Sequence, residues 1–257
     1  MKIGIIGDGA IARYVRSHLD DTHVCIVRPN KIRGVQASDT TLRVADASQI
    51  PDDTGLMIDC AGHSALAQHG PLILQRGISL VTVSLGALAD AQLYSELKSA
   101  ARQGASQLHL ASGAIGALDC LRAAKVGGLD TVTYLGRKPP QGWIGSPAET
   151  TLDLETLKIP SVHFDGNARE AATAYPKNAN VAAAVALAGV GFDQTQVRLI
   201  ADPSIDANIH ELSATGEFGS FTFRIEGKAL PDNPKSSALA AMSVVAAIDR
   251  MQAAITS

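Results

Sequence analysis

The chain has few cysteines, few aromatic side chains and no excess of positive charge, and the cysteines and the charge each argue against a class of protein. Its 257 residues include three cysteines, 4% aromatic residues and a formal net charge of −3. Cys25, Cys60 and Cys120 lie far apart in apolar segments, which predicts buried, reduced thiols rather than a disulfide framework or a metal site. The charge balance gives no reason to expect nucleic acid or an anionic membrane as a partner.

Long uninterrupted apolar segments are also missing, and the N-terminus enters a strand-like segment directly. A secretory signal needs a basic start and small residues after an apolar stretch, and neither is found. We therefore expect a cytoplasmic protein without a membrane span. The rest of the composition, 46% hydrophobic and 18% charged residues, is that of a globular protein with one large or two smaller domains.

The most informative segment is a glycine-rich turn at the start of the chain. The apolar residues 3–6 are followed by Gly7, Asp8, Gly9, Ala10, Ile11 and Ala12. This G-x-G-x-x-G/A spacing, between a strand and a helix, is typical of a dinucleotide site, although a turn that only reverses the chain is the alternative. Gly7 permits the tight turn, Gly9 admits a pyrophosphate, and the small Ala12 brings the helix close to the strand. The N–H groups at the start of that helix then face the phosphates.

Strand and helix patterns alternate through the first 110 residues. Predicted strands cover 3–6, 24–27, 42–45, 56–60, 78–83 and 107–110, and predicted helices cover 10–19, 64–76 and 90–103. Such alternation predicts an α/β fold with a doubly wound, parallel Rossmann sheet.

The pattern changes after residue 111. We expect a Gly- and Pro-rich loop at 136–143, helices at 168–175 and 181–188, and strands at 196–201, 205–215 and 220–227. An alanine-rich helix over 236–254 ends the chain. These patterns predict a second α+β domain over 111–234 with a mixed or antiparallel sheet. The C-terminal segment 235–257 is expected to complete the Rossmann domain formed by 1–110.

Arg28 bears on the choice of cofactor. In NAD-preferring units an acidic residue lies at the end of the second strand and binds the ribose 2′-hydroxyl. Here Arg28 occupies that region, and a cation there accommodates the 2′-phosphate of NADP. We therefore expect both NAD and NADP to be accepted, although a solvated strand-end arginine is the alternative.

Among seven histidines, His210 and His63 are the candidates for proton transfer. His210 lies among polar residues in an apolar strand pattern, and histidine titrates near neutrality, but an ordinary strand histidine gives the same pattern. His63 follows Cys60 and Ala61 at the carboxyl end of a strand, where ligands bind in open α/β sheets. A helix-entry residue is the alternative for His63. The other histidines are expected to be surface, packing or strand residues, and His163 is expected in a loop.

Several motifs in the same order along the chain resemble the L-aspartate dehydrogenase family. The matching segments are 7–12, 84–88, 111–116, 136–140, 175–181, 208–210 and 233–237. The resemblance implies NAD(P)-dependent, reversible oxidative deamination of L-aspartate through iminoaspartate to oxaloacetate and ammonia, in a homodimer whose second domain supplies the dimer sheet. Whether the product supplies nicotinamide biosynthesis or amino-acid catabolism is left open by the sequence.

The resemblance also implies roles for individual residues. His210 is the active-site histidine, and Ala114 and Asn180 contact the cofactor, with Asn178 as the alternative to Asn180. Two substrate carboxylates need donors, because a buried unpaired anion is costly. The residues expected at the cofactor are Gly7, Gly9, Ala10, Ile11, Ala12, Arg28, Cys60, Ala61, Ala114 and Asn180, and those expected at the substrate are Ser84, Ser112, Lys177 and Lys235, with Arg137 and Lys138 as further cations.

Two other functions compete with this one. A dihydrodipicolinate-reductase-like enzyme shares the two-domain plan, but its His-His-x-x-Lys motif is missing here. A non-catalytic NAD(P)-binding sensor would keep the glycine turn but would have no reason to retain His210 together with the Asn180 segment.

Overall fold

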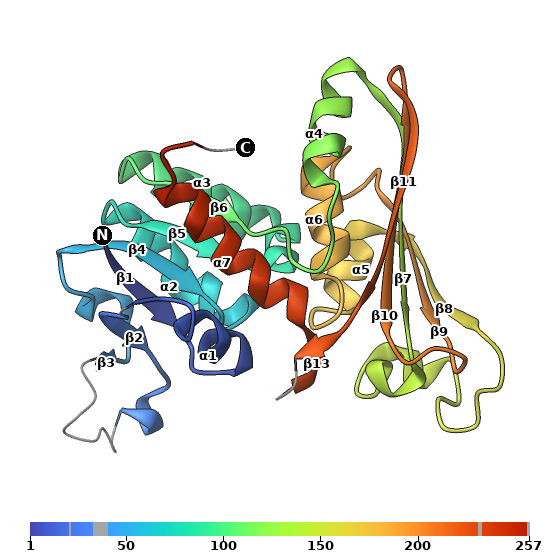
Figure 1. The fold of residues 1–257 in the computed structure, drawn as a ribbon, viewed down its shortest axis with the longest axis horizontal. Coiled ribbons are helices and arrows are strands. Elements are labelled where there is room, and N and C mark those ends of the chain that lie inside the picture. The colour runs from blue at the N-terminus through green and yellow to red at the C-terminus, as the bar shows by residue number, and fades with distance from the viewer. Residues whose placement is uncertain (21, 33–40, 231–232, 256–257) are drawn as a thin grey trace. The chain divides into compact units, whose positions relative to one another are not determined.

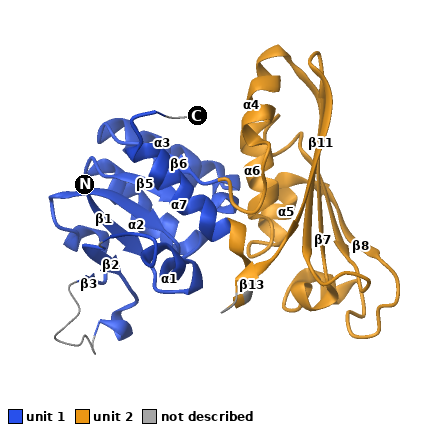
Figure 2. Cartoon of the chain, in the orientation of Figure 1, with its two compact units in different colours: residues 1–111, 240–257 blue, residues 112–239 orange. Residues whose placement is uncertain are grey.

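The computed structural model describes residues 1–257 except 21, 33–40, 231–232 and 256–257. The chain forms two compact units (Figure 2): unit 1 comprises Met1–Ala111 with Ala240–Ser257, and unit 2 comprises Ser112–Leu239. Within the described part of the chain, no helix combines the length and apolar character that a membrane span requires.

Unit 1 is built on a six-stranded parallel sheet with the order β3-β2-β1-β4-β5-β6 (Figure 1). Its strands are β1 (Lys2–Ile6), β2 (Val24–Ile26), β3 (Leu42–Val44), β4 (Thr54–Asp59), β5 (Ser79–Thr82) and β6 (Leu108–Leu110). This strand order is that of the doubly wound dinucleotide-binding fold, in which ligands bind at the carboxyl ends of the strands. The predicted Rossmann sheet is confirmed.

Helices pack against this sheet because its strands are apolar on both faces. They are α1 (Ala10–Arg16), α2 (His63–Gln75), α3 (Ala91–Gln103) and most of α7 (Ala238–Gln252), with short 3-10 turns η1 (Pro29–Lys31), η2 (Ala47–Gln49) and η3 (Leu85–Ala89). Val244 and Ile248 of α7 share one apolar core with Ile5 and Ile58 of the strands. The last helix of the chain therefore belongs to the core of unit 1.

Unit 2 contains a five-stranded sheet with the order β11-β10-β7-β9-β8. Its strands are β7 (Leu129–Lys138), β8 (Ser161–Asn167), β9 (Gln196–Ala201), β10 (Asn208–Gly216) and β11 (Gly219–Gly227), and β12 (Ala229–Leu230) pairs separately with β13 (Asn233–Ser237). Strands β7 and β9 are parallel and the other neighbours are antiparallel. The predicted mixed sheet is confirmed.

Helices lie along one face of this second sheet (Figure 1). They are α4 (Leu118–Gly127), α5 (Ala168–Ala174) and α6 (Asn180–Ala188), and η4 (Pro140–Trp143) and η5 (Pro147–Thr150) lie in the connection after β7. Side chains alternate between the two faces of a strand. Val132 and Tyr134 are buried, whereas Thr131 alternates with them and its hydroxyl hydrogen-bonds that of Thr215 at 2.7 Å.

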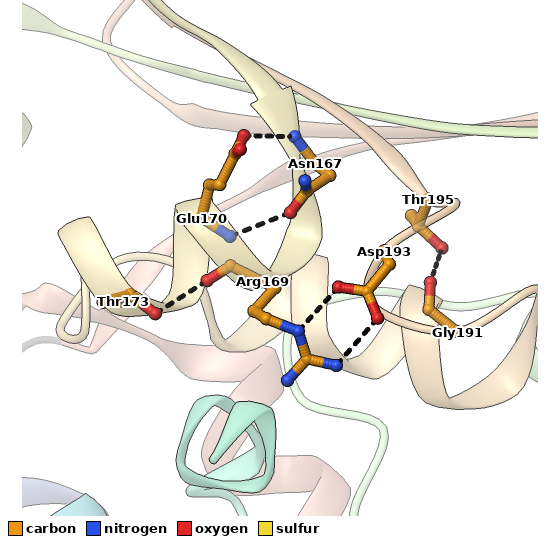
Figure 3. A network of polar contacts seen from close by, with 7 residues as sticks. All are labelled: Asn167, Arg169, Glu170, Thr173, Gly191, Asp193 and Thr195. Carbon is orange, nitrogen blue, oxygen red and sulfur yellow. Dashed lines mark hydrogen bonds and ion pairs between the residues drawn. The ribbon is translucent and has the colours of Figure 1, made fainter. Parts of the chain in front are cut away.

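A polar network fixes the start of α5 (Figure 3). The Asn167 side chain accepts the Glu170 backbone N–H at 2.9 Å, and the Glu170 carboxylate accepts the Asn167 N–H at 3.1 Å. This reciprocal capping box satisfies donors that a helix start otherwise leaves open. Arg169 forms two hydrogen bonds with Asp193, at 2.6 and 2.9 Å, which ties α5 to the turn before β9.

Three local predictions are wrong. The expected loop at 136–143 begins three residues too early, because β7 continues through Lys138 and pairs with β9 and β10. His163 lies in β8 rather than in a loop. The final helix begins at Ala238 instead of residue 236, because Asn233–Ser237 pairs as β13.

The prediction of three buried thiols is also wrong in part. Cys25 is buried and Cys60 is half-buried, but Cys120 is exposed on α4. The neighbouring Leu118, Leu121 and Ala124 form the buried side of that helix, so the apolar sequence around Cys120 belongs to its opposite face.

Candidate active site

The glycine turn after β1 has the geometry that a bound dinucleotide requires. Gly7 adopts a φ of +99°, which side-chain-bearing residues rarely adopt, and a Cβ there would lie 3.0 Å from that of Ala61. Gly9 precedes α1, and no side chain caps this helix. A Cβ built on Gly9 meets no described protein atom within 4 Å, so open space lies beside the turn. The first N–H groups of α1 are the donors that such a site offers to phosphate.

A cavity of about 610 Å³ lies at the carboxyl ends of β1, β2 and β4. Five of the residues predicted to bind the cofactor line it: Gly7, Gly9, Arg28, Cys60 and Ala61. Ala10, Ile11 and Ala12 lie in the first turn of α1, where Ala12 is fully buried. The size of the cavity and the glycine cradle fit a nicotinamide dinucleotide.

The charges around the cavity are mainly positive. Arg28 is exposed directly beyond the end of β2, where an acidic residue would select NAD. Lys31 pairs with Asp8 at 2.7 Å. That hydrogen bond lowers the pKa of Asp8, while partial burial opposes the shift. The negative charge of Asp8, in the middle of the glycine turn, is thereby compensated by Lys31 beside the expected phosphates.

Asp59, at the end of β4, organises the rim of the cavity, and sequence reasoning missed it. Its fully buried carboxylate accepts the Ala61 N–H at 2.9 Å and the hydroxyls of Thr82 and Ser84 at 2.7 and 2.6 Å. Burial raises the pKa of Asp59, and these hydrogen bonds oppose the shift. In the sequence, an acidic residue at the end of an apolar strand could have indicated that Asp59 has a role at this site. Ser84, expected at the substrate, is 2% exposed and donates its hydroxyl proton to Asp59.

His210 lies on β10, between Gly136 of β7 and Ile225 of β11 in the register of the sheet. The Tyr134 hydroxyl lies 2.7 Å from His210 Nδ1, and the two rings are nearly parallel with an interplanar angle of 18°. His210 is 3% exposed. Burial, helped by the nearby charge of Lys138, lowers the pKa of His210 to about 3. The imidazole is therefore neutral at physiological pH and can accept a proton.

Gly136 makes room for the contact between Tyr134 and His210. A Cβ at this position would lie 2.8 Å from the Tyr134 hydroxyl oxygen. Because side chains two residues apart share a strand face, the tyrosine extends over Gly136 to the histidine opposite. Tyr134 was not predicted as a site residue. In a strand, Tyr134, Gly136 and Lys138 lie on the same face, but this pattern could be recognised only if the segment was predicted to be a strand.

Strand geometry also separates the two cations at the end of β7. Arg137 pairs with Asp202 at 2.7 Å, whereas Lys138 is 9% exposed and donates a hydrogen bond to Asn178 Oδ1 at 2.8 Å. The Lys138 ammonium also lies 4.9 Å from the ring centre of Trp143. Burial lowers the pKa of Lys138 to about 8.

The remaining predicted residues lie in several places. His63 is the first residue of α2, after Gly62 with a φ of +95°. Ser112 is half-buried, Ala114 is buried, and Asn180 begins α6. The structure places Lys177 on the surface, in the turn before α6, and the Lys235 side chain lies outside the described residues.

A doubly wound sheet with a glycine cradle and a cavity of this size defines the class of the protein, a dinucleotide-binding protein of the Rossmann type. Comparison with protein families agrees for both units. Residues 4–111 match the model of the homoserine dehydrogenase NAD-binding domain, and residues 119–251 match that of the aspartate dehydrogenase C-terminal domain.

Individual relatives name the family. The chain is 53% identical to an L-aspartate dehydrogenase of Ruegeria pomeroyi, covering 99% of this chain and 94% of the relative, and 48% identical to one of Pseudomonas aeruginosa, covering 88% and 84%. The crystal structure of aspartate dehydrogenase from Thermotoga maritima is similar with a TM-score of 0.78 and 27% identity, covering 100% of this chain and 99% of that one. The chain belongs to the L-aspartate dehydrogenase family.

Proposed function

We propose that this protein catalyses the NAD(P)-dependent oxidative deamination of L-aspartate to iminoaspartate, which water converts to oxaloacetate and ammonia, and that the reaction is reversible. The observation that carries the proposal is the buried Tyr134–His210 pair in unit 2 of a chain that also has a dinucleotide cavity in unit 1. The family membership supports aspartate as the substrate.

His210 is the proposed proton acceptor. The nicotinamide, when bound, takes the hydride that leaves Cα of the substrate. Tyr134 occupies Nδ1 of His210, so Nε2 is the ring nitrogen that can face the substrate. Nε2 then accepts a proton from the substrate ammonium group, or from the water that attacks the imine.

The low pKa of free His210 is compatible with this role. It results from burial and from the positive charge of Lys138. A substrate with two carboxylates brings negative charge beside both groups, which favours the protonated imidazole and raises its pKa. His210 therefore becomes a stronger base when the substrate is bound.

Further residues are proposed from the family pattern. We infer that Gly7, Gly9, Ala10, Ile11 and Ala12, with Cys60 and Ala61, hold the dinucleotide, and that Ala114 and Asn180 contact it near the nicotinamide. Ser112, Lys177 and Lys235 remain proposed donors for the substrate. Ser84 is no longer among these donors, because its hydroxyl already donates a hydrogen bond to the Asp59 carboxylate.

We propose that both NAD and NADP are accepted and that Arg28 favours NADP. Replacing Arg28 by aspartate puts a negative charge where the 2′-phosphate would lie, so we expect the ratio of kcat/KM for NADP to that for NAD to fall at least about tenfold. Steady-state kinetics with both cofactors measures this ratio. The matched control is Arg250→Asp at the exposed end of α7. An unchanged ratio in Arg28→Asp would show that this arginine does not discriminate between the 2′-phosphate of NADP and the 2′-hydroxyl of NAD.

We also propose a cytoplasmic homodimer. The sheet of unit 2 supports the dimer, because helices cover one face and leave the other, which carries Thr131, Ser213 and Thr222 together with the charged Glu211 and Arg224, for a second copy. Light scattering should then give twice the 26.7 kDa mass of the chain, and a monomer mass would disprove it. Of the two pathways that the sequence leaves open, we propose that the product supplies pyridine nucleotide biosynthesis, with amino-acid catabolism as the alternative.

Cofactor reduction in the presence of L-aspartate tests the proposed reaction. We expect aspartate-dependent formation of NADH or NADPH at alkaline pH, where release of the product proton favours oxidation. Cofactor binding without reduction would indicate a non-catalytic sensor. Reduction of dihydrodipicolinate with no activity on aspartate would indicate the alternative reductase.

A further inference from the structure

The Lys138 ammonium group is buried in unit 2. Within the part of the chain that the structure describes, no carboxylate pairs with it. Its contacts are the Asn178 amide oxygen and the face of the Trp143 ring. Neither carries a negative charge, and burying an uncompensated charge costs several kcal/mol in free energy. A bound anion would offset this cost.

Two neutral histidines lie within reach of the same charge. Lys138 helps burial to lower the pKa of His210 to about 3 and that of His163 to about 4. His163 lies edge-on to Trp143, with ring centres 4.3 Å apart. The charge of Lys138 thus acts on the proposed base and on a second imidazole from β8.

His163 has an unused polar atom. Its Nδ1 lies 3.0 Å from the Tyr175 hydroxyl, while its Nε2 is buried and has no hydrogen-bond partner among the described residues. If the tyrosine donates to Nδ1, the imidazole proton is on Nε2. The result is an N–H donor near the lysine charge with nothing to donate to. Buried donors of this kind normally have a partner, so this N–H is a donor that a ligand can use.

We propose that Lys138 binds a carboxylate of the dicarboxylic substrate, with Asn178 holding the ammonium in place and His163 Nε2–H as a second donor. This inference rests on the proposed function and names the carboxylate-binding residue of that site. The inference also gives different roles to the neighbouring cations Arg137 and Lys138. Arg137 forms an ion pair with Asp202 near the end of the central strand β7, and Lys138 binds the substrate.

Succinate is the probe, because it has both carboxylates of aspartate but no amino group to be oxidised. We expect calorimetry with saturating NAD⁺ to show succinate binding to the wild-type protein and at least tenfold weaker binding to Lys138→Met. Methionine replaces a buried cation by an apolar chain of similar size, so the variant should keep its melting temperature. Lys158→Met, at an exposed position of the same unit, is the matched control.

Kinetics with aspartate separate this inference from the proposed function. Lys138→Met should raise the KM for aspartate at least tenfold, and Asn178→Ala should raise it by a smaller factor. If the wild-type protein does not oxidise aspartate with either cofactor, the proposed function fails. If it does, but KM and the succinate affinity of Lys138→Met are unchanged, Lys138 is not the carboxylate ligand. Wild-type protein that does not bind succinate also overturns the inference.

The pH dependence of succinate binding provides an independent readout. The titratable groups around Lys138 are His163 on β8, His210 on β10, Tyr134 on β7, Tyr175 after α5, and Asp202, whose backbone N–H donates to the Lys138 carbonyl at 2.9 Å. Burial acts to raise the pKa of Asp202, but its hydrogen bonds with Ser204 and with its ion-pair partner Arg137 lower it, so this carboxylate keeps its charge above pH 7. Burial lowers the pKa of both histidines to about 4 or below and raises that of both tyrosines. Lys138, with a pKa of about 8, is the group at this site that changes charge between pH 7 and 9. Affinity should therefore fall up to tenfold per pH unit above pH 8, and Lys138→Met should lose this dependence.

Discussion

Replacing His210 by alanine should lower the turnover of aspartate about 1,000-fold, with NAD(P) binding unchanged. The imidazole is the proposed proton acceptor, and Tyr134 holds its Nδ1 at 2.7 Å. Removing it leaves hydride transfer without a group that takes the proton. Steady-state kinetics gives the turnover, and cofactor fluorescence titration gives the affinity. The selective loss of turnover is expected because His210 lies in unit 2, whereas the cofactor cavity lies in unit 1.

Two companion variants make this result specific. Tyr134→Phe removes the hydrogen bond to Nδ1 but keeps the ring, so we expect turnover to fall about tenfold, with a shifted pH profile. His109→Gln changes a half-buried histidine of β6 in unit 1 and should leave turnover unchanged. Near-normal turnover in His210→Ala would remove His210 from the mechanism.

Replacing Asp59 by alanine should lower the free energy of unfolding by about 3 kcal/mol. The change leaves the donors of Ala61, Thr82 and Ser84 without their buried acceptor. It also loosens the turn carrying Cys60 and Ala61, so cofactor affinity should fall as well. Urea denaturation measures the stability, and the same fluorescence titration measures the affinity.

A matched control and a pH series test the cause. Asp130→Ala, at an exposed position of β7, should leave the urea midpoint unchanged. Burial raises the pKa of Asp59, so the folded state binds this proton more tightly than the unfolded state. The stability of the wild type relative to Asp59→Asn should therefore be greatest below pH 4 and should decline as the pH rises through the raised pKa. A constant difference would show that the carboxyl is not shifted.

Contacts between distant segments could not be predicted residue by residue. Tyr134 and His210 are 76 positions apart, and Lys138 and Asn178 are 40 apart. Their contacts depend on the register of β7 against β10 and on the turn before α6, which no local pattern specifies. Because 136–143 was expected to be a loop, the sequence could not show which of Arg137 and Lys138 has a buried side chain. Only a strand sends neighbouring side chains to opposite faces.

The sequence by itself determined the Rossmann sheet, the glycine cradle and the family resemblance, because these depend on contiguous residues and on local periodicity. Gly7 and Gly9 act through their own backbone, so six consecutive positions carry the whole signal. The tertiary structure alone decided which polar groups meet. It paired the Ser84 hydroxyl with Asp59 and buried Lys138 with no carboxylate partner among the described residues, because burial and pairing are properties of segments brought together by folding.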